Sequence, residues 1–170
     1  TQGNRQTNQK FVSDWKILKS RNVIRGCYHF FTSNSVPDTA AQHYFDVVGR
    51  LGYREIAPII DFEEDGTNKD SVKSEVRNRL LQTMQAVEKL FSRSPILYSN
   101  LTTIQKYGLS TDEFGQYRLW LAEWGVKRPR VPDAWKDKGI FIWQKKPNKK
   151  YGNSSADYDL YNGKLCDIYK

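Results

Sequence analysis

Sulfur-containing and imidazole side chains are scarce, since the 170 residues include two cysteines, one methionine and two histidines. Two cysteines are too few for a disulfide framework, and their spacing matches no zinc motif. A disulfide between Cys27 and Cys166 stays open but has no support. Cys27 lies beside Tyr28 in an apolar segment and is predicted to be a buried free thiol. The composition therefore indicates no metal site and no cofactor.

Long apolar runs are also missing. No stretch approaches the ~20 residues that a membrane-spanning helix needs. The first residues show no signal-peptide pattern. We therefore expect no membrane span.

Acidic residues are outnumbered, with 19 Asp and Glu against 27 Lys and Arg and a net charge of +8. This charge favours an anionic partner, such as nucleic acid, an acidic membrane surface or an anionic cell-wall polymer. The basic residues are scattered and form no nucleic-acid recognition motif, so we expect no nucleic-acid partner. The pairs Lys145–Lys146 and Lys149–Lys150 are expected in a loop beside the last strand. A solvated surface is the simpler interpretation of these pairs, and attraction of a wall polymer is the alternative.

Aromatic residues are plentiful, at 14% of the chain with five Trp and ten Tyr. Aromatic side chains fill protein cores, and their faces also stack on sugar rings. Core packing is the expected role for most of them. Trp124 and Trp135 are assigned to core or rim packing or to sugar stacking. His29 is expected to be a hydrogen-bonded wall residue rather than a proton carrier.

Short apolar segments alternate with amphipathic helices, which indicates a parallel α/β architecture in one domain over residues 1–170. Apolar spacing predicts helices around 11–18, from an N-cap at Asp38 to about 49, from a cap at Asp70 or Ser71 to 90, and over 99–107. Residues 127–137 are expected to form a loop. The predicted strands lie at about 23–31, 56–60, 95–98, 117–124, 140–144 and 154–159. Six strands make up most of a barrel but not all of one.

The strand predicted at 56–60 ends in a cluster of acids. Residues two apart on a strand point to the same face, ~6.6 Å apart, so Asp61 and Glu63 share a face. In parallel barrels the carboxyl ends of strands surround the active site, and two neighbouring acids raise the proton affinity of one of them. Glycoside cleavage requires such a pair. A solvated turn is the alternative interpretation, and Glu64 and Asp65 are expected to face solvent or to serve the loop.

Seven short blocks, in order along the chain, resemble glycoside hydrolase family 25, the muramidase family. Asp61-Phe62-Glu63 corresponds to the family's Asp-x-Glu strand. The other blocks are Thr1–Gly3, with Gln2 where the family usually has Glu, Arg25–Phe31, Pro95–Tyr98, Trp120–Trp124, Ile142–Gln144 and Ala156–Gly163.

The resemblance implies an α/β fold, a (β/α)-barrel with five helices and eight strands in the family, here with about six strands and the first two missing. It implies hydrolysis of the β-1,4 bond between N-acetylmuramic acid and N-acetylglucosamine in peptidoglycan. By the same resemblance Glu63 is the proton donor, and Asp61 stabilises the sugar cation or orients the substrate's acetamido group. Asp157 is implied to be a further acid of the cleft. The implied sugar-holding residues are Tyr28, Tyr98, Trp120 and Trp143.

The family's first strand carries another cleft Asp in a Gly-x-Asp-x-Ser block, which has no counterpart here. We therefore expect these residues alone to form an N-terminally incomplete, open barrel with exposed sheet edges. The alternative to a lysozyme is a non-catalytic cell-wall-binding module derived from one. The expected partner is the peptidoglycan glycan strand, with no obligate protein partner. The expected location is secreted or directed to the cell envelope.

Overall fold

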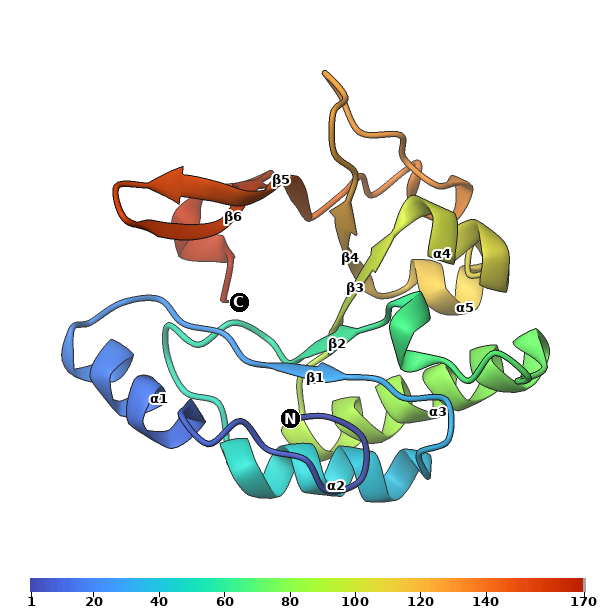
Figure 1. Ribbon diagram of the computed structural model, residues 1–170, viewed down its shortest axis with the longest axis horizontal. Helices are drawn as coiled ribbons and strands as arrows, with labels where there is room; N and C mark the ends of the chain where they lie inside the picture. Colours follow the sequence, from blue (N-terminus) through green and yellow to red (C-terminus); the bar gives the residue numbers. More distant parts are fainter. Residues whose placement is uncertain (170) are drawn as a thin grey trace.

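The protein is built around one curled sheet, seen in a computed structural model that describes residues 1–169. Six strands follow one another across the sheet in the order in which they occur in the chain (Figure 1). The first five are parallel and the sixth is antiparallel to the fifth. The strands are β1 (Tyr28–Phe30), β2 (Ile59–Asp61), β3 (Ile96–Asn100), β4 (Arg118–Ala122), β5 (Ile142–Tyr151) and β6 (Ser154–Tyr161).

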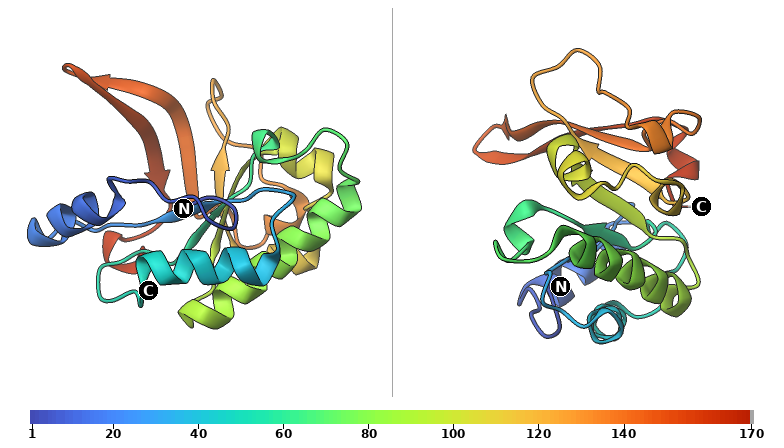
Figure 2. Two further views of the ribbon diagram at one scale, coloured as in Figure 1. Left: turned by 60° about the horizontal axis from the view of Figure 1, so that its bottom comes forward. Right: turned by 90° about the vertical axis from the view of Figure 1, so that its right-hand side faces the viewer.

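Helices connect the parallel strands and cover one side of the sheet. The longest two, α2 and α3, lie side by side beneath β1 and β2, and the β5–β6 hairpin projects away from the body (Figures 1 and 2). The helices are α1 (Phe11–Ser20), α2 (Pro37–Val48), α3 (Lys73–Phe91), α4 (Leu101–Tyr107) and α5 (Asp112–Gly115). Short 3-10 turns are η1 (Glu64–Gly66), η2 (Asp133–Trp135) and η3 (Leu165–Asp167). No described helix is long and apolar enough to cross a membrane.

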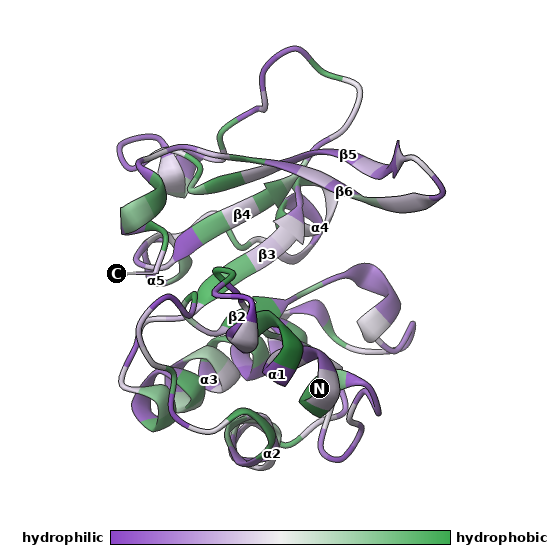
Figure 3. Cartoon of the chain, turned by 90° about the vertical axis from the view of Figure 1, so that its left-hand side faces the viewer, coloured by the Kyte–Doolittle hydropathy of each residue, from purple (hydrophilic) through white to green (hydrophobic). Residues whose placement is uncertain are grey.

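The two faces of the sheet have different chemistry because side chains alternate along each strand. The face under the helices belongs to the main hydrophobic core and includes Ile60, Leu97, Leu119 and Leu121. Hydrophobic residues gather along β3 and β4 (Figure 3). The opposite face carries a smaller apolar cluster around Ile59 and Ile96. The more polar residues of this face follow directly after that cluster.

Most predicted elements are confirmed, but several boundaries differ. Asp38 lies in the first turn of α2, whose N-cap is Val36, and neither Asp70 nor Ser71 caps α3, which begins after Val72. The short helix α5 was not expected. Lys145 to Lys150 belong to β5 rather than to a loop, because the hairpin extends to Tyr151.

The burial of Cys27, His29 and the two tryptophans in question agrees with the predictions made for them. Cys27 is a buried free cysteine, and Cys166 is free and exposed. His29 is fully buried, and its Nδ1 lies 2.8 Å from the Thr1 hydroxyl. Trp135 is fully buried and donates its indole N–H to the Tyr117 carbonyl at 2.9 Å, whereas Trp124 is 53% exposed. His29 is therefore a buried, hydrogen-bonded residue of β1, as predicted.

The sheet is open within residues 1–169, as expected for a barrel of about six strands. β1 and β6 are at opposite ends of the strand order. Beyond β1, Gln2 forms a parallel bridge to Phe30, and the Phe30 N–H donates to the Thr1 carbonyl at 2.9 Å. Thr1 to Gly3 thus occupy the position of a further parallel strand beside β1.

Tyr44 joins α2 to the first two strands. Its buried hydroxyl donates to the Cys27 carbonyl at 2.7 Å and accepts the Ile59 N–H at 3.2 Å. Both backbone groups precede strand residues that line the candidate site. This single hydroxyl therefore helps to hold β1 and β2 in register.

Replacing Tyr44 by Phe is expected to destabilise the protein by about 2 kcal/mol, because the Ile59 N–H and the Cys27 carbonyl lose a buried partner. Thermal unfolding followed by circular dichroism measures the effect. Tyr151→Phe, at a side chain that is 49% exposed, is the matched control. Equal melting temperatures for the two variants would contradict this role.

Candidate active site

The register of the parallel strands aligns three of the predicted site residues. Asp61 pairs with Tyr98 across β2 and β3, and Tyr98 pairs with Trp120 across β3 and β4. Residues that pair in a parallel sheet project from the same face. All three side chains therefore point into the concave side of the sheet, at the carboxyl end of the strands.

Glu63 reaches the same face two residues beyond Asp61. Its backbone remains extended, with φ −124° and ψ 159°, before the chain turns into η1. Gly66 ends that turn against the backbone of Phe31, where a Cβ would lie 2.1 Å from the Phe31 carbonyl oxygen. Only glycine fits there, so this close approach helps to position the segment that carries Glu63. Glu64 and Asp65 are exposed, as expected.

A cleft of about 520 Å³ opens over this face. Six of the seven predicted site residues line it, namely Asp61, Glu63, Asp157, Tyr28, Tyr98 and Trp120. Gly26, Cys27, Ile56 and Ile59 form part of its wall. The structure thus brings together side chains from β1, β2, β3, β4 and β6.

Trp143 is the exception, because the prediction that it lines the cleft is wrong. It lies in the main core at 8% exposure, and its indole donates to the Glu123 carbonyl at 2.7 Å. Its neighbours in sequence, Ile142 and Gln144, project from the opposite face of β5. Alternation along the strand therefore turns Trp143 toward the helix-covered core and gives the cleft Gln144 instead.

Gln144 and Asp159 are cleft residues that the sequence analysis did not assign. A signal for both was present. Asp157 and Asp159 stand two residues apart, as Asp61 and Glu63 do, and the same alternation places them on one face. Gln144 pairs with Asp159 in the hairpin register.

Asp61 and Glu63 share an environment that favours the protonated form. Burial first, and then the charge of Glu63, raise the pKa of Asp61 to about 7. The Asp61 Oδ1 atom is buried without a hydrogen-bond partner. Burial, followed by the charges of Asp65 and Asp157, raises the pKa of Glu63, while a hydrogen bond to Tyr98 opposes this shift. The pair therefore retains a proton nearer to neutral pH than isolated carboxyls would.

The Tyr98 hydroxyl is placed to accommodate either protonation state of Glu63. It lies 3.1 Å from Gln144 Oε1 and also hydrogen-bonds Glu63. A hydroxyl has one donor proton and can also accept. It can donate to Glu63 when that side chain is ionised, or accept from it when protonated while donating to Gln144.

Gln144 connects this hydroxyl to the far wall of the cleft. The side chain is 4% exposed and donates from Nε2 to Asp157 Oδ2 at 2.9 Å. Its Oε1 also accepts the indole N–H of Trp124 at 3.0 Å. Trp120 donates its indole N–H to Asp159 Oδ1 at 2.9 Å. These bonds fix the orientation of the residues that face the two acids.

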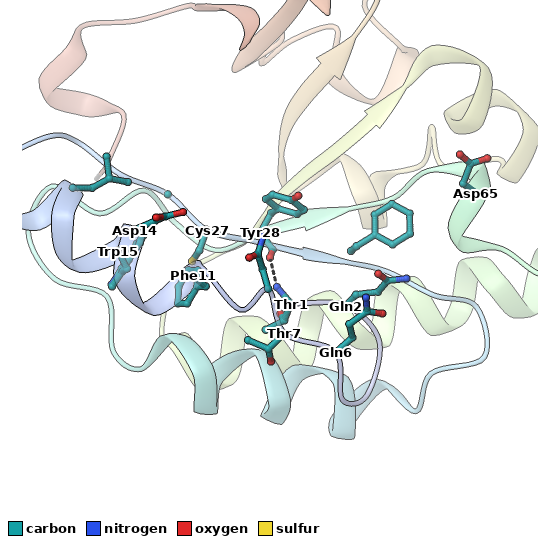
Figure 4. Close-up of a pocket in the computed structure, with 14 residues that line it drawn as sticks. Thr1, Gln2, Gln6, Thr7, Phe11, Asp14, Trp15, Cys27, Tyr28 and Asp65 are labelled. Carbon is teal, nitrogen blue, oxygen red and sulfur yellow. Dashed lines mark hydrogen bonds between the residues drawn. The ribbon is translucent and has the colours of Figure 1, made fainter. Parts of the chain in front are cut away.

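A second cavity, about 810 Å³, shares Gly26, Cys27 and Tyr28 with the cleft. Residues of the N-terminal segment and α1 line it, together with Cys27 and Phe30. Its two acids, Asp14 and Asp65, stand at opposite ends and do not form a pair (Figure 4). The smaller cleft is therefore the candidate active site, because it brings four carboxyl groups together.

The fold and this cleft define an α/β protein of the barrel type with paired carboxyls at the carboxyl ends of its parallel strands. The family model described as glycosyl hydrolases family 25 matches residues 1–151. The chain belongs to this family.

Solved structures of low sequence identity share the fold. The bacterial lysozyme from Streptomyces coelicolor aligns with a TM-score of 0.87 at 18% identity, covering 99% of this chain and 82% of that one. A family 25 lysozyme from Aspergillus fumigatus aligns with a TM-score of 0.83 at 22% identity, covering 99% and 83%. These likenesses confirm the predicted fold class.

Curated relatives are longer than this chain. An uncharacterized protein, YegX, from Escherichia coli O157:H7 is 26% identical over 170 residues, which are 96% of this chain and 57% of the relative. Lysozyme M1 from Streptomyces globisporus is 22% identical over 180 residues, 99% of this chain and 60% of the relative. The chain thus spans less than two thirds of the length of these relatives.

The raised pKa of Asp61 has a consequence for stability. The folded protein holds the Asp61 proton up to about pH 7, whereas the unfolded chain releases it near pH 3.8. The folded state binds more protons between these values, so this group makes the free energy of unfolding fall as pH rises from about 4 to 7. Above pH 7 the loss is complete.

Asp61→Asn is therefore expected to raise the free energy of unfolding at pH 8 by about 2 kcal/mol relative to wild type, and to change it little at pH 3.5. Chemical denaturation at the two pH values measures the difference. Asp70→Asn, at an exposed acid outside the cleft, serves as the control. A gain that is the same at both pH values would contradict the proposed burial cost.

Proposed function

We propose that the protein is a lysozyme of the muramidase type, which cleaves the β-1,4 bond between N-acetylmuramic acid and N-acetylglucosamine in peptidoglycan. The observation that carries this proposal is the pairing of Asp61 and Glu63 in a cleft with aromatic walls. The family and the names of its lysozyme relatives support the same activity. On this proposal residues 1–170 form a single catalytic domain, and the protein is secreted or directed to the cell envelope.

Glu63 is the proton donor in this proposal. Its proton passes to the glycosidic oxygen as the bond from that oxygen to the sugar carbon breaks. Water then adds to the sugar carbon and returns a proton to Glu63. The Tyr98 hydroxyl supports Glu63 before and after the transfer, because it can donate or accept.

Asp61 is the partner carboxyl in this proposal. The Asp61 carboxyl group lines the cleft and is suited to accept the N–H of the substrate's acetamido group or to face the developing sugar cation. In the free protein Asp61 has the more strongly raised pKa, because it is the more deeply buried acid. A hydrogen bond from the substrate would favour ionised Asp61 and leave the shared proton on Glu63.

Aromatic rings supply the sugar-binding surface. Tyr28 is 57% exposed at one wall, and Trp120 packs edge-on against Tyr98 at the other, with ring centroids 5.6 Å apart. Asp157 and Asp159 add acceptors for sugar hydroxyls. The expected partner is thus a glycan strand lying across the carboxyl ends of the parallel strands β1 to β4 and the adjoining part of the β5–β6 hairpin.

Glu63→Gln is expected to reduce wall digestion at least a hundredfold, because the glutamine has no proton to donate to the leaving oxygen. The measurement is the release of reducing ends from purified peptidoglycan. Glu64→Gln, at the adjacent exposed carboxyl that pairs with Lys106, should retain wild-type activity.

Undiminished digestion by Glu63→Gln would refute the assignment. Binding to the wall without turnover by the unmodified protein would support the alternative of a non-catalytic wall-binding module.

Tyr98→Phe is expected to move the alkaline limb of the rate profile to higher pH. The hydrogen bond from Tyr98 lowers the pKa of Glu63, so its loss raises that pKa and keeps Glu63 protonated at higher pH. The maximal rate should fall at the same time, since ionised Glu63 loses a donor. A pH–rate profile on soluble glycan fragments measures both effects, and a shift to lower pH would refute the interaction.

A further inference from the structure

A basic groove, distinct from both cavities described above, lies beside the cleft. It has no role in the proposed hydrolysis. It encloses about 410 Å³ and is lined by Trp124, Gly125, Val126, Lys145, Lys146, Lys149 and Tyr158. Its walls are the chain that leaves β4 and the strands of the β5–β6 hairpin. None of its lining residues is acidic.

The lysines of this groove carry charge that the described residues do not neutralise. Within residues 1–169, no carboxylate lies within ion-pair distance of Lys145, Lys146 or Lys149. Lys145 and Lys149 are nevertheless only half exposed. Lys149 Nζ lies 3.9 Å from the centre of the Tyr158 ring, and Lys145 Nζ lies 5.1 Å from that of Trp143. The aromatic faces hold these ammonium groups in place without cancelling their charge.

Trp124 joins the groove to the cleft. It lines the groove, and its indole N–H binds Gln144, which lines the cleft. The hairpin strands alternate between the two sites, since Asp157 and Asp159 line the cleft while Tyr158 between them lines the groove. Charge is thereby separated, with carboxyl groups on one side of the hairpin strands and ammonium groups on the other.

This separation matches a ligand with a neutral backbone and anionic branches. A sugar chain offers hydroxyl and amide groups to the acidic cleft, whereas an anionic branch is repelled there and attracted to the lysines. A peptide stem of four or five residues reaches roughly 15 Å when extended, which is enough to leave the cleft and enter a neighbouring groove.

Building on the proposed function, we infer that the groove lined by Lys145, Lys146 and Lys149 binds the free carboxylates of the peptide stems carried by the glycan strand in the cleft. The groove then selects the position of cleavage, because it favours binding of glycan in which the sugars at the cleavage point carry stems. It makes stem-bearing glycan the preferred substrate over bare glycan.

The test measures binding to insoluble peptidoglycan by co-sedimentation. All proteins carry Glu63→Gln, so that wall is not consumed. The double variant Lys145→Gln/Lys149→Gln is compared with Lys150→Gln/Lys164→Gln, which removes the same charge from exposed positions outside the groove. The wall is used in two forms, both freed of phosphate-containing polymers. One has free stem carboxylates, and in the other carbodiimide and ammonia have converted them to amides.

On wall with free carboxylates, the groove variant should bind about tenfold more weakly and the control within twofold of its parent, because two partly buried ion pairs are lost. On amidated wall, the Glu63→Gln parent should bind more weakly than on wall with free carboxylates, by a similar factor. The groove variant should bind the two walls equally. Circular dichroism confirms that the variants are folded.

The inference would be overturned if the two double variants weakened binding equally. It would also be overturned if the groove variant still bound amidated wall more weakly than its parent by the same factor. A lysine effect that is absent on these two polymer-free walls but present on a third, untreated wall that keeps its phosphate-containing polymers would overturn it as well. Digestion assays with Glu63 intact separate this outcome from the proposed function, because turnover without lysine-dependent binding refutes the groove alone. Lysine-dependent binding without turnover refutes the hydrolase alone.

Discussion

The alignment of the parallel strands is the constraint on which the site depends. Asp61, Tyr98 and Trp120 meet because β2, β3 and β4 pair at these three residues. A shift of one residue in any strand would turn its side chains into the core and bring core residues into the cleft. The helix-covered face resists such a shift, since Ile60, Leu97 and Leu121 would become exposed. Tyr44 adds a direct restraint by bonding backbone groups next to β1 and β2.

The same alignment gives the cleft its electrostatic character. Four carboxyl groups converge in the cleft, and burial raises the pKa of three of them, namely Asp61, Glu63 and Asp159. Such a cluster opposes folding at neutral pH. The hydrogen bonds from Tyr98, Trp120 and Gln144 offset part of this cost and fix side-chain positions. A site that holds a proton near neutral pH is suited to acid catalysis of glycoside cleavage.

Local pattern was sufficient for some of these features and failed for others. Alternation predicted that Asp61 and Glu63 share a face, and their neighbours Glu64 and Asp65 are exposed as expected. The same rule, applied to β5 and β6, would have replaced Trp143 by Gln144 and added Asp159. The helix caps predicted at Asp38 and at Asp70 or Ser71 were wrong, since the N-caps are Val36 and Val72. Residue type alone locates a helix end only to within about one or two residues.

The sequence by itself determined the order of strands and helices, the acid pair at the end of β2 and the family to which the chain belongs. These follow from hydrophobic periodicity and short motifs, which are local properties of the chain. Only the tertiary structure decided which face of β5 enters the cleft, how Gln144 connects Tyr98, Trp124 and Asp157, and that half-exposed lysines line a groove beside the acids. These depend on strand register and on the bulged pairing of the β5–β6 hairpin, which bring together residues distant in sequence. Local preferences carry no information about such pairings, because the energies that select them arise from contacts formed only in the folded sheet.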